Sequence, residues 1–337
     1  MKPAGPRLVL AATILAASCG RYADFTLPPL AGGDAALTYQ FDQQPQPVLT
    51  RGAGWESHDV LNPSVVRSGS DLLNLYSGFD GRTWHTGLAA STDGLRWEKR
   101  GRILSPAPET WEGGYIAANG SALPCRDQLC YWYVAGPAER PRIGLARSPD
   151  ARAWRKELQP VLAPGPYRSW DEYGVADPYA IRVEPYFYLY YLGQDRAARQ
   201  RIGLARSTDG IHWQKLRSSP ILESGDIGAF DEDAVGEPAV WVSQGYYWML
   251  YTGQNAIQER RLGLARSTDG VHWTKLSAVF AGSAAWDSKV ICDATVLVEG
   301  DVVRVWFGGG DVARRDYNLN GQIGYGILHP ASATLGK

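Results

Sequence analysis

The sequence predicts an all-β protein, a β-propeller of five four-stranded antiparallel blades, and three observations predict it. The 337 residues include 13 Trp, 18 Tyr and 38 Gly but only 2 Met, a composition that suits strands and tight turns. One unit of pattern recurs five times along the chain. A turn motif, Ser-Thr-Asp-Gly, ends the same strand in successive units, where Asp caps its own backbone and Gly supplies a positive φ.

Residues 1–18 are expected to be a signal peptide rather than part of the fold. Lys2 and Arg7 form a basic region, and an apolar run of ten residues ends at Ala17. The stretch from Leu15 to Cys19 resembles a bacterial lipobox, so we expect cleavage before Cys19 and lipidation of that cysteine. An ordinary signal peptide followed by a chance cysteine is the alternative. Residues 19–35, rich in Pro and Gly, are expected to be a tether.

The repeats place equivalent residues at the starts of five strands. These lead positions are 57, 58, 60 and 56 residues apart and are occupied by Asn62, Asn119, Asp177, Glu237 and Asp293. Each unit continues with a second strand such as Tyr246–Tyr251, then a third strand that ends in the turn motif, and a Trp that returns on a fourth. Four strands are enough for one propeller blade. The propeller is therefore expected over residues 36–330.

The fifth unit lacks its outer strand, because only nine residues follow its third strand. The missing strand is expected at the other end of the chain. Gln46-Pro47-Val48-Leu49 repeats Gln159-Pro160-Val161-Leu162, which follows the outer strand of the second unit. Residues 36–49 should therefore pair with the last blade and close the ring, which removes exposed strand edges.

The cysteines of an exported chain are informative. Cys125 and Cys130 bracket a four-residue turn between two strands, which predicts a disulfide across the hairpin. Cys292 has no evident partner and is expected to be buried as a small apolar residue.

Charge and motif content exclude several classes of function. With 34 basic and 35 acidic side chains, the net charge of −1 gives no field that would attract nucleic acid or an anionic membrane. No apolar run reaches the ~18 residues of a spanning helix. No His/Cys/Asp spacing indicates a catalytic zinc site, and no glycine loop precedes a helix to bind phosphate. We therefore expect no metal and no cofactor.

The five lead residues must face one another around the central channel. Three carboxyls there repel one another, so at least one should hold a proton near neutral pH. A protonated carboxyl beside an ionised one is what acid–base cleavage of a glycosidic bond requires. Glu237 stands between Asp177 and Asp293 in the ring, so it is expected to hold that proton. The alternative is that these residues only cap backbone groups.

The acid-Pro strand starts Asp177-Pro178 and Glu237-Pro238, together with the Gly-Leu-Ala-Arg-Ser-Thr-Asp-Gly hairpins, resemble the five-bladed glycosidases of glycoside hydrolase families 43 and 32. The resemblance implies that Glu237 is the catalytic acid and Asp177 the carboxyl that orients the sugar. The blade before Asp177 should carry a further Asp but has Asn119. Asp293 is the remaining ring carboxylate and is expected to activate water.

Further sugar-binding residues are expected at the same mouth of the channel, because the loops between second and third strands return there. Aromatic, amide and basic side chains in such loops bind sugar hydroxyls or anions. The candidates are Asn62, Asn119, His58, His85, Arg196, Asn255 and Arg315.

Three functions remain open. The first is an exported, monomeric glycosidase, lipid-anchored to the bacterial cell envelope, that acts on an oligosaccharide or polysaccharide. The second is a carbohydrate-binding propeller without catalysis, which the two ring asparagines favour. The third is a phosphorolytic relative, in which basic residues bind phosphate in place of the base.

Overall fold

The computed structural model describes residues 21–332; the predicted signal peptide and Cys19 lie outside them. The described chain is almost entirely β, so the predicted all-β propeller fold is confirmed. Two short 3-10 turns, η1 (Gly54–Glu56) and η2 (Ala285–Asp287), precede strands. No helix in this part of the chain is long and apolar enough to cross a membrane.

Twenty of the strands in residues 21–332 pair as five antiparallel sets of four. The first two sets are β3 (Asp59–Ser68), β4 (Asp71–Phe79), β5 (Trp84–Ser91), β6 (Glu98–Leu104), then β7 (Ile116–Cys125), β8 (Gln128–Gly136), β9 (Arg142–Ser148), β10 (Arg155–Lys156). The next two are β11 (Gly174–Val183), β12 (Tyr186–Gln194), β13 (Gln200–Ser207), β14 (Gln214–Leu216), then β15 (Ala234–Ser243), β16 (Tyr246–Gln254), β17 (Arg260–Ser267), β18 (Thr274–Phe280). The last is β19 (Val290–Glu299), β20 (Val302–Gly310), β21 (Gln322–Ser332) and β2 (Leu37–Gln43).

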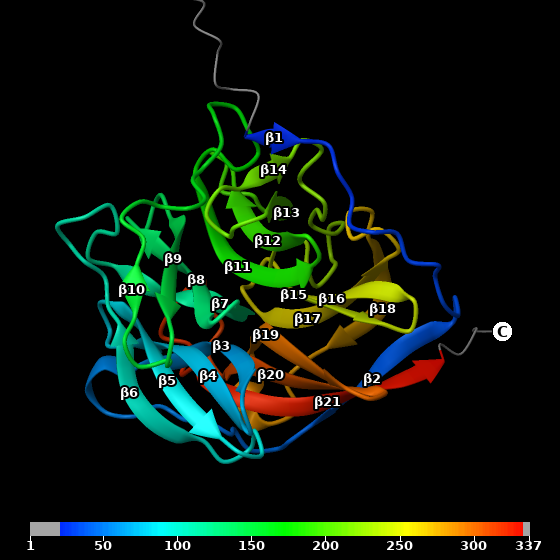
Figure 1. The fold of residues 1–337 in the computed structure, drawn as a ribbon. Coiled ribbons are helices and arrows are strands. Elements are labelled where there is room, and N and C mark those ends of the chain that lie inside the picture. The colour runs from blue at the N-terminus through cyan, green and yellow to red at the C-terminus, as the bar shows by residue number, and fades with distance from the viewer. Residues whose placement is uncertain (1–20, 333–337) are drawn as a thin grey trace, which may run out of the picture.

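The first strands of the sets surround a central axis. β3, β7, β11, β15 and β19 each contact the next, and β19 contacts β3, so the ring is closed (Figure 1). Large apolar side chains fill the space between neighbouring sets, with Trp132, Trp248 and Trp306 fully buried.

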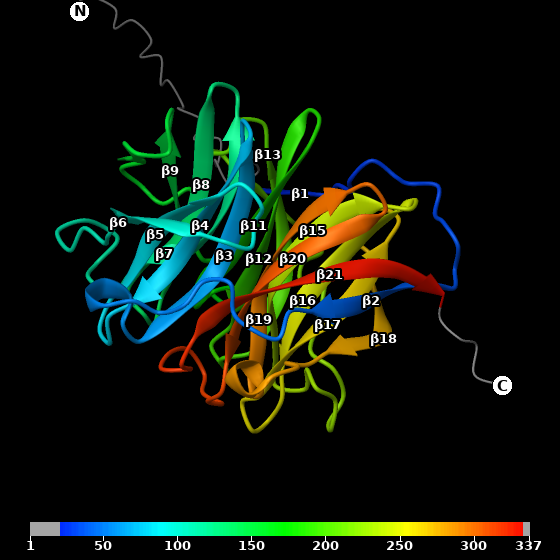
Figure 2. The same cartoon turned by 90° about the horizontal axis from the view of Figure 1, so that it is seen from below.

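The last set is completed by the N-terminal strand, as predicted. β2 pairs antiparallel with β21 from Leu37–Ser332 to Gln43–Gly326, and Leu49 forms an isolated bridge with Ile323. Figure 2 shows the blue strand β2 beside the red strand β21. The two ends of the described chain are thereby joined in one sheet, which removes a free edge.

Residues 21–35 differ from the expected tether, because they pack against the third and fourth blades. β1 (Tyr22–Ala23) pairs parallel with β14, and the chain then runs along the edge of the molecule to β2 (Figure 1). Leu27 is completely buried, and its backbone N–H donates to Asp269 O at 2.9 Å. One apolar anchor and a few backbone hydrogen bonds therefore fix a segment whose Pro and Gly content resembles that of a linker. We call residues 21–35 the strap.

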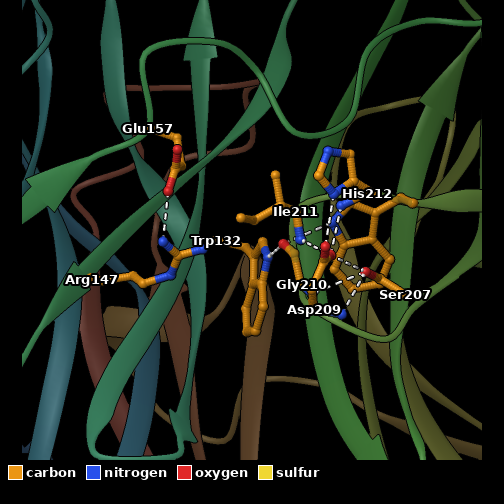
Figure 3. Close-up of polar contacts among 9 residues, drawn as sticks. Trp132, Arg147, Glu157, Ser207, Asp209, Gly210, Ile211 and His212 are labelled. Carbon is orange, nitrogen blue, oxygen red and sulfur yellow. Dashed lines mark hydrogen bonds and ion pairs between the residues drawn. The ribbon is translucent and has the colours of Figure 1, made fainter.

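At Gly94, Gly210 and Gly270 the turn motif links its blade to the neighbouring blade as well as reversing the chain. In the third blade, Asp209 Oδ1 accepts hydrogen bonds from the backbone N–H groups of Ile211 and His212, both at 2.8 Å (Figure 3). The carbonyl of Gly210 accepts a 2.9 Å bond from Trp132 Nε1 of the preceding blade. Gly210 has a φ of +75°, and a Cβ there would lie 2.8 Å from the Trp132 ring, so only glycine fits.

Four blades contain the same buried cluster of a carboxylate, a lysine and a tyrosine. In the third blade Lys215 pairs with Asp171, which also accepts a 3.2 Å bond from the Tyr191 hydroxyl. The other copies are Glu56–Lys99–Tyr76, Glu112–Lys156–Tyr133 and Asp231–Lys275–Tyr251.

The fifth blade keeps the acid of this cluster but not its partners. Asp287 is completely buried, and its Oδ2 has no hydrogen-bond partner. Phe307 takes the place of the tyrosine. Gln43 takes the place of the lysine, because it pairs with Gly326 as Lys275 pairs with Ala265. Its Nε2 donates to Ala281 O at 2.8 Å, while its Oε1 is also unpartnered.

The predicted disulfide between Cys125 and Cys130 is present across the β7–β8 hairpin, with Cα atoms 5.8 Å apart. Cys292 is a buried free thiol, as predicted.

Candidate functional site

The ring residues share an unusual backbone conformation at the starts of the inner strands. Asn62, Asn119, Asp177, Glu237 and Asp293 all have φ between 46° and 53°. At each, the register with the next strand shifts, which marks a bulge. The bulge turns the side chain out of the strand's alternation and toward the channel.

The left-handed backbone conformation suits four of the ring residues better than the fifth, Glu237. Asn and Asp tolerate it because their short polar side chains bond locally, whereas Glu is not favoured there. Backbone preference can therefore account for the residue type at the other four positions but not at Glu237. A strained residue that the backbone does not favour is typical of a functional position.

All five ring residues line one cavity of about 320 Å³ at the mouth of the channel. Its wall combines apolar, aromatic and polar groups, as sugar-binding pockets do. The aromatic side chains are Trp84, Tyr115 and Tyr173, and the charged ones outside the ring are Glu139, Arg260, Arg315 and Asp316.

Hydrogen bonds connect neighbouring ring members. Asn119 Nδ2 donates to Asp177 Oδ1 at 2.6 Å. On the other side, the backbone N–H of Asp293 donates to Glu237 Oε2 at 3.1 Å. Asp293 Oδ2 accepts from the Cys292 thiol at 3.0 Å, while its Oδ1 is buried without a partner. The ring thus contains two hydrogen-bonded pairs, Asn119–Asp177 and Glu237–Asp293, and one buried carboxylate oxygen of Asp293 remains unpaired.

Two ring carboxyls have raised pKa values. Burial, followed by the charge of Glu237, raises the pKa of Asp177 to about 8. The same two causes raise the pKa of Asp293 well above its ordinary value. The sequence places the proton on Glu237, because two anions flank it. In the structure the ring residues with raised pKa values are the two that flank Glu237, Asp177 and Asp293.

A buried arginine balances the ring's negative charge. Arg260 is 9% exposed, and its Nε donates to Gln254 Oε1 at 3.3 Å. Burial disfavours its charge, but the nearby carboxylates, Glu237 foremost, raise its pKa overall. Arg260 therefore remains a cation beside the ring.

Ligand atoms of Glu237, Cys292 and Asp293 lie within 4.8 Å of one another, close enough to hold a metal ion. A cation at that point would compete with Arg260 for the same carboxylates. Burial raises the pKa of Cys292 far above the ordinary value, so its sulfur is a protonated thiol rather than a thiolate ligand.

Three of the seven predicted sugar-binding residues line the cavity: Asn62, Asn119 and Arg315. His58, His85, Arg196 and Asn255 are not among its lining residues. His85 lies against Asp80 and Ser105, and Asn255 holds its own loop through the backbone N–H of Glu259. Arg196 is exposed and pairs with Glu172. The repeat pattern gives the direction of a loop but not the direction of its side chains.

Sequence reasoning does not single out Arg260, Tyr115 or Asp316 as site residues. Arg260 and the neighbouring Arg261 look equivalent in the sequence, but alternation along β17 buries the first and exposes the second. That alternation is the signal that could have found Arg260. Asp316 lies in a loop without any repeat, so nothing in the sequence distinguishes it.

A closed ring of inner strands with a carboxylate-lined cavity at one mouth defines a glycosidase-type β-propeller. The sequence profile of the "Glycosyl hydrolases family 32 N-terminal domain" matches residues 74–224 and, overlapping, 144–299. The chain belongs to this family, and the resemblance drawn from its motifs is confirmed.

The chain is also similar to two relatives in sequence and to several solved structures in fold. Two Mycobacterium tuberculosis proteins, named "Uncharacterized protein MT1551" and "Uncharacterized protein Rv1502", are each 27% identical over 237 residues, which cover 63% of this chain and 75% of theirs. The solved structure of a glycosyl hydrolase from Bacteroides ovatus has a TM-score of 0.68 at 16% identity, covering 88% of this chain and 96% of its own.

Two further structures show the same fold. A member of the "GH130 family of mannoside phosphorylases", which "contains glycoside hydrolases", has a TM-score of 0.67 at 16% identity and covers 92% of this chain and 99% of its own. The Bombyx mori GH32 beta-fructofuranosidase BmSUC1 has a TM-score of 0.62 at 14% identity and covers 87% of this chain and 62% of its own.

Proposed function

We propose that this protein is a glycosidase that cleaves an O-glycosidic bond by acid–base catalysis at the ring carboxyls Asp177, Glu237 and Asp293. The observation that carries the proposal is the raised pKa of Asp177, about 8, beside a second carboxyl whose pKa is also raised. A proton held at neutral pH next to a carboxylate is what protonation of a leaving-group oxygen requires.

The charge of Glu237 raises the pKa of both Asp177 and Asp293, so a proton held on either carboxyl belongs to the group rather than to one residue. Glu237 has the longest side chain of the three, lines the cavity, and occupies a backbone conformation unfavourable for Glu. We assign it delivery of the proton to the glycosidic oxygen. Asp177 retains the proton within the group between turnovers, and Asp293, with an unpaired Oδ1, takes a proton from the attacking water.

Hydrolysis fits the cavity better than phosphorolysis. Among the residues that line it, the cations are Arg260 and Arg315. Arg260 already balances Glu237 and Asp293, which leaves Arg315 alone for an incoming phosphate. Phosphate sites ordinarily combine several cations or backbone N–H groups. A binding protein without catalysis would gain nothing from carboxyls with raised pKa values.

We also propose that the protein is exported as a monomer and lipid-anchored through Cys19. The support is the lipobox-like sequence and the disulfide between Cys125 and Cys130, which fits an oxidising compartment. Its substrate would then be an oligosaccharide or polysaccharide outside the cytoplasm.

The test is Glu237→Gln, assayed against a panel of oligosaccharides and 4-nitrophenyl glycosides, with and without phosphate. We expect kcat to fall about 10²–10⁴-fold on oligosaccharides, the usual size of a general-acid contribution. The loss should shrink on 4-nitrophenyl glycosides, because their leaving group needs little protonation. Parent activity should decline as pH rises through about 8, where the pKa of Asp177 lies.

Gln258→Glu serves as a charge control, because residue 258 lies in the exposed turn before β17. Full turnover by Glu237→Gln on an oligosaccharide would remove Glu237 as the acid. Phosphate-dependent release of a sugar phosphate would replace hydrolysis by phosphorolysis.

A further inference from the structure

The loop between β20 and β21 brings two charged side chains to the cavity from outside the ring. Residues 311–321 contribute Arg315 and Asp316 to the cavity wall. The loop also contacts the site's buried cation, because Arg260 Nη2 donates to the carbonyl of Arg314 at 3.4 Å. Arg315 and Asp316 are exposed, whereas the ring residues are buried or half-buried, so the loop meets the cavity at its entrance and the ring residues lie on its floor.

A buried carboxylate of another blade holds this loop. Asp59, completely buried at the start of β3, accepts backbone hydrogen bonds from Asn318 at 2.6 Å, Leu319 at 2.9 Å and Gly321 at 2.8 Å. Three such bonds to one carboxylate fix the backbone of the loop's second half. The loop is thus a rigid part of the wall, attached across the junction between the fifth and first blades.

Asp316 lines the cavity, and its charge acts on three other residues of the cavity wall. Its carboxylate adds to the raised pKa of Asp177, after burial and Glu237, and to the raised pKa of Tyr115, after burial. It also adds to the raised pKa of Arg260. Tyr115, Asp177 and Arg260 come from three different blades, and all line the cavity. Asp316 therefore lines the same cavity as these three residues and lies near enough for its charge to act on them.

We propose that Asp316, together with Arg315, forms the subsite for the leaving group, and that Asp59 is the positioning residue that holds this subsite against the ring. This inference rests on the proposed glycosidase function and specifies one half of its substrate. The ring at the floor takes the sugar whose anomeric carbon reacts. The part of the substrate that departs must lie toward the entrance, beside the loop.

The chemistry of the pair selects a class of leaving group. An exposed carboxylate accepts hydrogen bonds from two neighbouring hydroxyls of a sugar ring, and a guanidinium donates to its oxygens. Glu139 adds a second negative charge to the cavity wall, and negative charges repel an acidic leaving group. The subsite therefore fits a neutral sugar with vicinal hydroxyls, not a uronic acid.

The experiment compares two substrates with the same reacting sugar, a neutral disaccharide and its 4-nitrophenyl glycoside. Asp316→Asn should lower kcat/KM on the disaccharide about 10–100-fold, the equivalent of one lost charged hydrogen bond. The effect on the 4-nitrophenyl glycoside should stay within about threefold. Asp301→Asn is the control, since it removes one exposed carboxylate from the β19–β20 turn at the other end of the same blade.

A second measurement concerns pH. Removal of the Asp316 charge should move the alkaline limb of the pH–rate profile to lower pH on both substrates, because one of the charges that raise the pKa of Asp177 is lost. Asp59→Asn should reproduce the selective loss on the disaccharide if the loop depends on it.

If Asp316→Asn lowers kcat/KM equally on both substrates, or on neither, the leaving-group assignment is overturned. The glycosidase function is tested separately by Glu237→Gln and does not depend on that result. If the parent cleaves no substrate, the proposed function fails by itself. In that case the subsite is tested by saturation-transfer NMR with free neutral monosaccharides. If Asp316→Asn abolishes the binding of a monosaccharide, the leaving-group subsite is supported. If the binding is unchanged, the subsite is overturned.

Discussion

Gln43→Lys should stabilise the protein by supplying the cation that the fifth blade lacks. In the other four blades a lysine lies 5.4–5.8 Å from the centre of the tyrosine ring and pairs with the buried acid. In the fifth, Asp287 Oδ2 and Gln43 Oε1 are both buried without partners. A lysine at position 43 starts from the strand register that the other four lysines use.

The magnitude follows from two opposing contributions. A hydrogen bond to a charged group contributes about 1.5–3 kcal/mol. Ordering a lysine side chain costs about 1–2 kcal/mol. The net gain in the free energy of unfolding is about 1 kcal/mol. For a domain of 150–250 residues, this raises the melting temperature by about 2–4 °C. The propeller is larger than that, so we expect a rise of about 2 °C.

The gain should depend on pH in a defined direction. Burial raises the pKa of Asp287 in the folded protein. Protonated Asp287 contributes its full stability when the pH is below the pKa of the unfolded chain, about 3.9. That stability is lost as the pH rises through the higher pKa that Asp287 has in the folded protein. The introduced lysine would lower that pKa and so remove the loss. The difference in melting temperature between variant and parent should therefore be larger at pH 8 than at pH 5.

Thermal unfolding followed by circular dichroism at both pH values measures this difference. Lys215→Gln is the reciprocal control: it leaves Asp171 buried without its cation and should cost about 3–5 kcal/mol. A Gln43→Lys protein that melts at or below the parent temperature at pH 8 would refute the reasoning, because the four complete clusters would then not be a guide to the fifth.

Two further predictions concern the ends of the chain. Deletion of residues 36–49 should lower the melting temperature by more than removal of residues 333–337, because it takes away β2 and exposes β21 as an edge; equal melting temperatures would contradict the closure of the fifth blade by β2. Cys19→Ser should move the protein from the membrane fraction to the soluble fraction of the producing bacterium, and retention in the membrane fraction would exclude the lipid anchor.

The repeats carry most of the information about the fold. Each strand start, turn and Trp recurs at nearly constant spacing, so the five ring residues and the pairing of β2 with β21 could be inferred without coordinates. The strap could not, because its packing depends on Leu27, whose burial against a distant turn leaves no periodic pattern.

Site residues that lie at repeated strand positions can be predicted from the sequence, whereas site residues that lie in loops cannot. Asn62 and Asn119 line the cavity because their positions follow from the blades. The prediction for His58 and Arg196 depends on loop direction alone, and loop direction does not determine where a long side chain points. The raised pKa of Asp177 depends on how deeply its side chain is buried and on its distance from the charge of Glu237, and a repeat pattern reveals neither.

The strap gives the molecule a fixed orientation with respect to whatever holds its N-terminus. Its backbone is bonded to Gly245, Thr268 and Asp269, which lie in turns at the end of the fourth blade opposite the cavity. Only one residue separates Cys19 from Arg21 in the sequence, so the proposed acyl group would lie within about 7 Å of chain length of the strap. Such a protein would be held to the membrane through the outer edge of its third blade, where the strap begins, so its cavity would keep a fixed position relative to the membrane surface.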